Sequence, residues 1–220
     1  MTDFISEYDK YKDKKDEYVE YLKQIIIDSN EIPEGNIFYP HQTLNLLPTL
    51  KAKQANLFWS GKQAKTKICE IGFNAGHSAM VMLLGRDQGP LDFTIFDINE
   101  HKYTMPCYKY IQSKFSNVSF EFIEGDSTKT MPKWIRLNPH LIGTYDVVHL
   151  DGGHSEYCIT NDMKSSDMLV KKGGIIIIDD TDFSHINIHV NNILLSGKYE
   201  EVTEIVKTTR YLHRIIRKLG

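Results

Sequence analysis

The sequence has few cysteines, no long apolar run and little net charge, and each shortage excludes a class of protein. The three cysteines are scattered and lack the spacing of a metal site, so we expect reduced thiols at Cys69, Cys107 and Cys158. No apolar run approaches the roughly 20 residues that span a bilayer, and the charged N-terminus is unlike a secretory signal. A formal net charge of −3 gives no reason to expect nucleic acid. We therefore expect a cytoplasmic protein without membrane or nucleic-acid partners.

The first 40 residues are predicted to form a helical extension to a larger domain. Apolar residues recur at helical spacing over residues 4–28, and the helix is expected to end near Asn30. The extension either packs on the domain, contributes to a homodimer or acts as a lid over the substrate. A second helix is predicted over residues 41–59, with an interruption near Pro48.

The rest of the domain, which we assign to residues 41–220, alternates between strand-like and helical runs. Strands are expected near residues 67–71, 92–97, 118–123, 145–150 and 174–179, and helices near residues 77–85, 104–114, 128–136, 155–170 and 183–196. Tyr199–Val206 and Tyr211–Arg217 are too close together for a crossover helix and should form an antiparallel hairpin, with one strand at the sheet edge. This order predicts an α/β fold: a doubly wound, Rossmann-like, seven-stranded and mostly parallel sheet.

The first strand runs into a glycine-containing loop. Gly72 and Gly76 lie between a strand and a helix, where glycine lets the backbone approach a ligand closely. The following helix begins at His77 and Ser78 and offers free N–H groups to an anion. The spacing differs from the Gly-x-Gly-x-x-Gly fingerprint of dinucleotide sites, so a cofactor that carries a carboxylate fits better. Glu70, just before the loop, could accept from an ammonium group or order the loop.

The next two strands also end in acidic residues. Asp97 follows the second strand, where a carboxylate accepts hydrogen bonds from ribose hydroxyls, although it could also be a surface group or a helix cap. Asp126 and Ser127 follow the third strand and could bind an adenine ring or simply cap the next helix. An amino-acid end, a ribose and an adenine, taken in chain order, describe S-adenosylmethionine.

The Glu70–Ser78 segment resembles the first motif of the class I S-adenosylmethionine-dependent methyltransferases, and in particular of the metal-dependent catechol and caffeoyl-CoA O-methyltransferases. The segment Asp151-Gly152-Gly153-His154, followed by Gly173–Asp180, is more similar to the macrocin and mycinamicin sugar O-methyltransferases. The resemblance covers about residues 40–220. It implies cofactor contacts at Glu70, Gly72, Asn74, Gly76, Ser78, Asp97, Asp126, Ser127 and Asp151.

Three aspartates follow the fourth and fifth strands. The tips of adjacent parallel strands lie about 4.8 Å apart, so Asp151, Asp179 and Asp180 can converge on one point. Carboxylate oxygens suit Mg²⁺ or another hard divalent cation. The resemblance implies that all three are metal ligands; the alternative is that Asp179 and Asp180 cap the next helix or line the cofactor pocket. The catechol type has Asn in place of Asp180, which favours the sugar type.

His154 lies three residues after Asp151, at the offset where the resembling families hold a general base. Imidazole has an unperturbed pKa of about 6.5 and accepts a proton near neutral pH. We therefore predict His154 and Asp151 as catalytic residues, with a solvent-facing histidine as the alternative. His149 lies within an apolar strand and is expected to be a core histidine with its polar atoms satisfied.

The sequence thus predicts a divalent-metal-dependent O-methyltransferase that uses S-adenosylmethionine and acts on a small-molecule or sugar hydroxyl, with a preference for sugars. The alternatives are a metal-independent N- or O-methyltransferase and a non-catalytic cofactor-binding module. Residues 36–42 and 183–191 could wall the acceptor pocket. The basic residues of the last predicted strands are read as a solvated face rather than a nucleic-acid site: Arg210, Arg214, Arg217 and Lys218.

Overall fold

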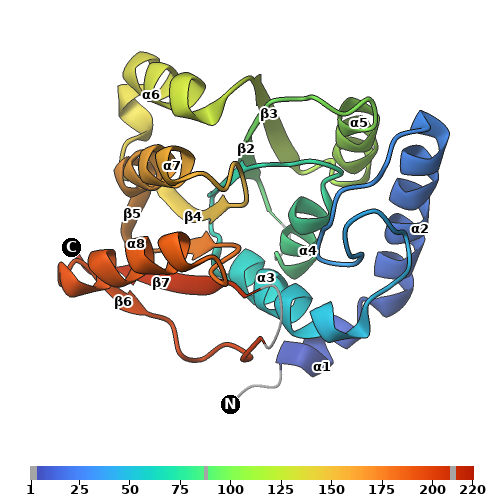
Figure 1. Cartoon of the computed structure of the whole chain (residues 1–220), viewed down its shortest axis with the longest axis horizontal. Coiled ribbons are helices and arrows are strands. Elements are labelled where there is room, and N and C mark those ends of the chain that lie inside the picture. Colours follow the sequence, from blue (N-terminus) through green and yellow to red (C-terminus); the bar gives the residue numbers. More distant parts are fainter. Residues whose placement is uncertain (1–3, 87–88, 209–211) are drawn as a thin grey trace.

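A computed structural model describes residues 4–86, 89–208 and 212–220 as a sheet covered on both faces by helices (Figure 1). The seven strands have the order β3-β2-β1-β4-β5-β7-β6. They are β1 (Lys67–Ile71), β2 (Leu91–Asp97), β3 (Val118–Glu124), β4 (Tyr145–Leu150), β5 (Val170–Ile178), β6 (Tyr199–Glu201) and β7 (Arg214–Lys218). The first five are parallel, and β7 pairs antiparallel with β5 and β6. The predicted α/β fold is confirmed.

The helices form two layers because successive residues of each buried strand face opposite sides of the sheet. Ile175 and Ile177 pack into one core, whereas Ile176 and Ile178 pack into the other. The first core lies under α3 (Lys51–Gln63), α4 (His77–Gly85) and α5 (Thr104–Lys114), and the second under α6 (Ser127–Leu137), α7 (Glu156–Leu169) and α8 (Ser184–Leu195). Two short 3₁₀ turns complete the elements: η1 (Pro48–Leu50) and η2 (Pro139–Leu141).

The N-terminal extension is part of the first core. It forms two helices, α1 (Phe4–Asp9) and α2 (Lys12–Ser29), so the prediction of one continuous helix over residues 4–28 is wrong. The break follows from tertiary packing: the rings of Tyr8 and Tyr11 both lie against Phe58, with centroids 5.4 and 5.3 Å away, and Tyr8 donates a hydrogen bond to Gln54.

None of the described helices is long and apolar enough to cross a membrane.

The helix predicted over residues 41–59 is wrong in its first part. Residues 41–47 are not helical, and α3 begins only after η1. Pro48 stands in the first turn, where its missing N–H is harmless, and therefore starts the helix instead of interrupting it. The loop before it is held by its own polar contacts: the Asn36 side chain accepts from the N–H groups of Phe38 and Tyr39, and Leu47 N–H donates to the carbonyl of Phe38.

The C-terminal hairpin is confirmed in its pairing, with β6 at the sheet edge, but both strands are shorter than predicted. Residues 202–208 carry no strand, and Arg210 and Tyr211 lie outside the described residues. The helices after β1 and β4 lie on opposite faces, which makes the gap between these two strands the switch point of the sheet. Open α/β sheets bind their ligands at the carboxyl ends of the strands beside such a point.

Candidate functional site

The loop after β1 is forced into close contact with the tip of β4. Gly72 and Gly76 both have positive φ, +84° and +73°, which disfavours any residue with a side chain. A Cβ atom on Gly72 would lie 1.9 Å from the carbonyl oxygen of Asp151. The N–H of Asp151 in turn donates to the carbonyl of Ile71 at 2.8 Å. The two glycines therefore let the loop turn beside Asp151. We call the side chains of Asp151, Asp179 and Asp180 the carboxylate cluster.

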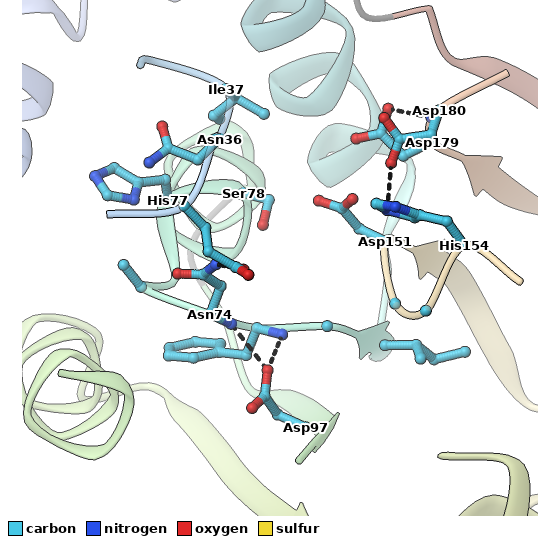
Figure 2. A pocket seen from close by; sticks show the side chains of 18 of the residues that line it. Asn36, Ile37, Asn74, His77, Ser78, Asp97, Asp151, His154, Asp179 and Asp180 are labelled. Atoms are coloured by element: carbon cyan, nitrogen blue, oxygen red, sulfur yellow. Dashed lines mark hydrogen bonds and ion pairs between the residues drawn. The ribbon is translucent and has the colours of Figure 1, made fainter. Parts of the chain in front are cut away.

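Asp97, at the end of β2, holds this loop in place. Its Oδ2 accepts from the backbone N–H groups of Phe73 and Asn74 at 2.7 and 2.9 Å (Figure 2). Its Oδ1 accepts from the backbone N–H of Asn99 at 2.7 Å. Asp97 also lines the cavity described below. It therefore orders the glycine loop, and its predicted contact with a ribose remains a prediction.

Glu70 lies beneath the loop rather than in the cavity. Its Oε1 accepts from Ser78 Oγ at 2.6 Å and lies 2.9 Å from Nδ1 of His149, and both Glu70 and His149 are fully buried. Burial alone would lower the pKa of His149, but the hydrogen bond to Glu70 and the charge of that carboxylate raise it. Of this group only Ser78 lines the cavity. Glu70 thus links the start of α4 to β4 from beneath the loop and does not line the cavity, where the sequence had predicted a cofactor contact.

Asp126 and Ser127 lie at the start of α6 and have different surroundings. Asp126 is the N-cap of the helix: its Oδ1 accepts from the backbone N–H of Thr128 at 3.0 Å and from its hydroxyl at 2.6 Å. Ser127 lines the cavity and donates to Oδ2 of the buried Asp162 at 3.0 Å. The cap that the sequence allowed for Asp126 is therefore present, and its contact with adenine remains a prediction.

The aspartates after β4 and β5 lie near one another, but they do not form the single set of three carboxylates that the sequence predicted. Figure 2 shows the side chains of Asp151, Asp179 and Asp180 pointing toward a common region that His154 also faces. Ligand atoms of Asp151, His154 and Asp180 lie within 4.8 Å of one another, and so do those of His149, Asp151 and Asp179. His154 Nε2 lies 2.8 Å from Asp180 Oδ2. Among the described residues, these two overlapping sets share Asp151 and could each hold a cation.

Sequence reasoning missed Lys53, which enters the same cluster from α3. Its Nζ lies 2.6 Å from Oδ2 of Asp179, and both side chains are buried. The other oxygen of Asp179, Oδ1, accepts from the backbone N–H of Asp180 at 2.9 Å. The only signal in the sequence was position: Lys53 lies one helical turn before Leu57, on the buried side of α3.

The carboxylates of the cluster repel one another, and a bound cation would reduce this repulsion. Burial raises the pKa of Asp151, and the adjacent Asp179 carboxylate raises it further. Burial also acts on Asp179, but the ammonium of Lys53 and the imidazole of His149 hold the pKa of Asp179 below its ordinary value. The hydrogen bond to Asp180 raises the pKa of His154. His149 and Lys53 lower the pKa of Asp151 but do not offset the effects of burial and of Asp179.

A cavity of about 660 Å³ connects the glycine loop with the carboxylate cluster. Gly72, Asn74 and Asp97 line one part of it, and Asp151 and His154 line another. The segments predicted to wall the acceptor pocket contribute Asn36, Ile37, Tyr39, His41 and Phe183. Ile98 was not anticipated; it is a large apolar side chain, 51% exposed, that lines the cavity directly after Asp97.

A protein-family model described as a methyltransferase domain matches residues 69–181 of the chain. No match was found among curated protein sequences.

Solved structures with the same fold include several methyltransferases. An O-methyltransferase from Bacillus cereus, in complex with SAH, has a TM-score of 0.62 and 15% identity, and the match covers 93% of this chain and 91% of that one. TomG, an O-methyltransferase from Streptomyces achromogenes in complex with SAM, has a TM-score of 0.60 and 12% identity over 93% and 90% of the two chains. CalS11, a TDP-rhamnose 3'-O-methyltransferase, has a TM-score of 0.56 and 16% identity over 75% and 77%.

Proposed function

The chain belongs to the methyltransferase domain family, and from that premise we propose that it transfers a methyl group from S-adenosylmethionine to a hydroxyl oxygen of a small-molecule or sugar acceptor, with the help of a divalent cation. The observation that carries the proposal is the single cavity that joins the glycine loop after β1 to the carboxylates after β4 and β5.

S-adenosylmethionine fits the residues of this cavity from end to end. Its amino-acid part would lie against the loop from Gly72 to Ser78, where the start of α4 offers free N–H groups. Its ribose would lie at Asp97, and its adenine against the exposed apolar side chain of Ile98 and the Gly125–Ser127 turn. The cofactors named for the Bacillus cereus enzyme and TomG support this choice.

The carboxylate cluster fits a hard divalent cation in both chemistry and charge. The donors are carboxylate oxygens, which Mg²⁺ and Mn²⁺ prefer. Three aspartates and one lysine leave the cluster with two formal negative charges, the number that a divalent ion balances. The resemblance implied Asp151, Asp179 and Asp180 as ligands; Asp151 and Asp180 are the two without a lysine partner. Such an ion makes a coordinated hydroxyl more acidic.

His154 is the residue proposed to remove the proton from the acceptor hydroxyl. It faces the cavity beside Asp151 and its side chain is 53% exposed; in the neutral ring Nε2–H donates to Asp180, so Nδ1 is the nitrogen that can accept a proton. Asp180 orients the ring through its contact with Nε2, and Phe183 stacks on the imidazole with centroids 5.5 Å apart. S-adenosylmethionine, when bound, would supply the methyl group to the acceptor oxygen and release a neutral thioether.

The acceptor class follows from the ion. Two neighbouring oxygens, as in sugar diols and catechols, chelate a hard cation with open positions. The aspartate pair at Asp179 and Asp180, together with His154, favours a sugar hydroxyl, and the rhamnose acceptor named for CalS11 supports the same choice.

A metal-independent N- or O-methyltransferase is the second candidate, and the ion pair between Lys53 and Asp179 is the observation that favours it. Lys53 already supplies one positive charge where the three carboxylates meet. A non-catalytic cofactor-binding module is a third possibility, which the presence of His154 in the cavity disfavours.

One set of assays separates these functions. The purified chain would be incubated with methyl-labelled S-adenosylmethionine and a panel of sugar diols and catechols, with Mg²⁺ and with excess EDTA. We expect methylation of a diol that EDTA abolishes and Mg²⁺ restores. Transfer that persists in EDTA would favour the metal-independent enzyme, and cofactor binding without any transfer over the panel would favour the binding module.

A further inference from the structure

Lys53 holds an unusual place among the lysines of the chain. It is 6% exposed, whereas its neighbour Lys51 on the same helix points outward and pairs with Asp9 on the surface. A buried ammonium needs a charged partner, because leaving it unpaired costs several kcal/mol. Lys53 has one in Asp179, at 2.6 Å.

The pair occupies one side of the carboxylate cluster. Asp179 makes a contact through each of its oxygens, to Lys53 through Oδ2 and to the backbone N–H of Asp180 through Oδ1. Lys53 and Asp179 line the same cavity as Asp151, Asp180 and His154, but they are only 6% and 4% exposed, whereas the side chains of His154 and Asp180 are 53% and 20% exposed. A cation that approached Asp179 directly would meet the Lys53 ammonium at close range, and the two positive charges would repel each other.

We propose that Lys53 is a positioning residue that acts as the internal cation of this site: it withholds Asp179 from a divalent ion and confines that ion to Asp151 and Asp180, beside His154. The inference rests on the proposed function. It assigns Lys53 two effects: to place the ion at the more exposed side of the cluster, next to the base, and to set how tightly the ion binds.

A charge series tests this without any acceptor. Mn²⁺ binding to the full-length, metal-stripped protein would be followed by calorimetry and by the loss of the free-ion EPR signal. The cluster has a formal charge of −2 in the wild type, −3 in Lys53→Met, −2 in Lys53→Met/Asp179→Asn and −1 in Asp179→Asn. Lys51→Met is the matched control, because it removes a lysine of the same helix that points to solvent.

We expect Lys53→Met to bind Mn²⁺ at least about tenfold more tightly than the wild type, since it removes the repulsion and frees Asp179 as a ligand. The double variant should bind within about threefold of the wild type, because the pair contributes no ligand and no net charge. Asp179→Asn should bind more weakly, and Lys51→Met should match the wild type.

The inference would be overturned if Lys53→Met bound Mn²⁺ no more tightly than the wild type. It would also be overturned if the double variant bound Mn²⁺ about tenfold more weakly than the wild type, because Asp179 would then be a direct ligand. If Lys53→Met fails to fold, the double variant decides, since it removes both members of the buried pair together. Binding by Lys53→Met but not by the wild type would also overturn the inference, because the wild type would have no ion for Lys53 to place, and it would remove the metal from the proposed function. No binding by either would reject both.

Discussion

The close approach of Gly72 to Asp151 gives the sharpest prediction for a single substitution. An alanine at Gly72 would have to adopt a φ of +84°, which costs about 1–2 kcal/mol for a residue with a Cβ. That Cβ would lie 1.9 Å from the carbonyl oxygen of Asp151, so the tips of β1 and β4 must move apart, at about 1–3 kcal/mol more. We expect Gly72→Ala to lower the free energy of unfolding by about 2–5 kcal/mol.

Gly143→Ala is the matched control for this experiment. Gly143 also has a positive φ, +67°, but nothing lies within 4 Å of the position of its Cβ. Its replacement should therefore cost only the backbone contribution, about 1–2 kcal/mol. Urea unfolding of both variants, followed by circular dichroism, separates the overlap from the backbone strain.

The same displacement should reach the cofactor. Gly72 and Asp151 both line the cavity, so moving the two strand tips apart should weaken S-adenosylmethionine binding at least tenfold, or about 1.4 kcal/mol, by calorimetry. Gly143→Ala should bind normally. The reasoning is refuted if Gly72→Ala unfolds at the same urea concentration as Gly143→Ala and binds the cofactor like the wild type.

Three further substitutions test other parts of the account. His154→Ala should lower kcat by about 10²–10⁴-fold in the transfer assay with an unchanged cofactor Kd, and an unaffected kcat would remove its role as base. Glu70→Gln should remove the negative charge beside His149, whose pKa is raised in the folded protein by that contact. That stabilisation is complete below the unfolded pKa and fades as pH rises through the folded one, so the loss in urea unfolding should be larger at about pH 6 than at about pH 9; equal losses would contradict the pairing. His77→Phe should make the free energy of unfolding less sensitive to acid, because burial lowers the pKa of His77 to about 3. The wild type must therefore lose about 1.4 kcal/mol of this free energy per pH unit as pH falls from about 6.5. If the free energy of unfolding falls equally with pH in the two proteins, this ring does not cause the acid loss.

The order of elements and the convergence of the aspartates could be predicted because both follow from local pattern. Buried parallel strands appear in the sequence as short apolar runs, and the residues after each run must lie at one edge of the sheet. Asp97, Asp151, Asp179 and Asp180 were found in this way.

The features that the sequence did not reveal depend on contacts between distant segments. Lys53 is a lysine like the exposed Lys51 of the same helix, and only the packing of α3 brings it to Asp179. The break between α1 and α2 arises because Tyr8 and Tyr11 both pack on Phe58 of α3. At Asp126, a cap and a ligand require the same residue type at the same position, so the sequence could not separate the two.

The central claim is that one cavity holds S-adenosylmethionine beside a divalent ion at the tips of β4 and β5. The most direct measurement is a crystal structure of the chain grown with S-adenosylhomocysteine and Mn²⁺, with anomalous data collected for manganese. We predict cofactor density along the Gly72 loop with its ribose at Asp97, and an anomalous peak within ligand distance of Asp151 and Asp180. Cofactor density without a manganese peak, or a peak bound elsewhere, would contradict the metal-dependent mechanism, and a cavity without cofactor would contradict the account as a whole.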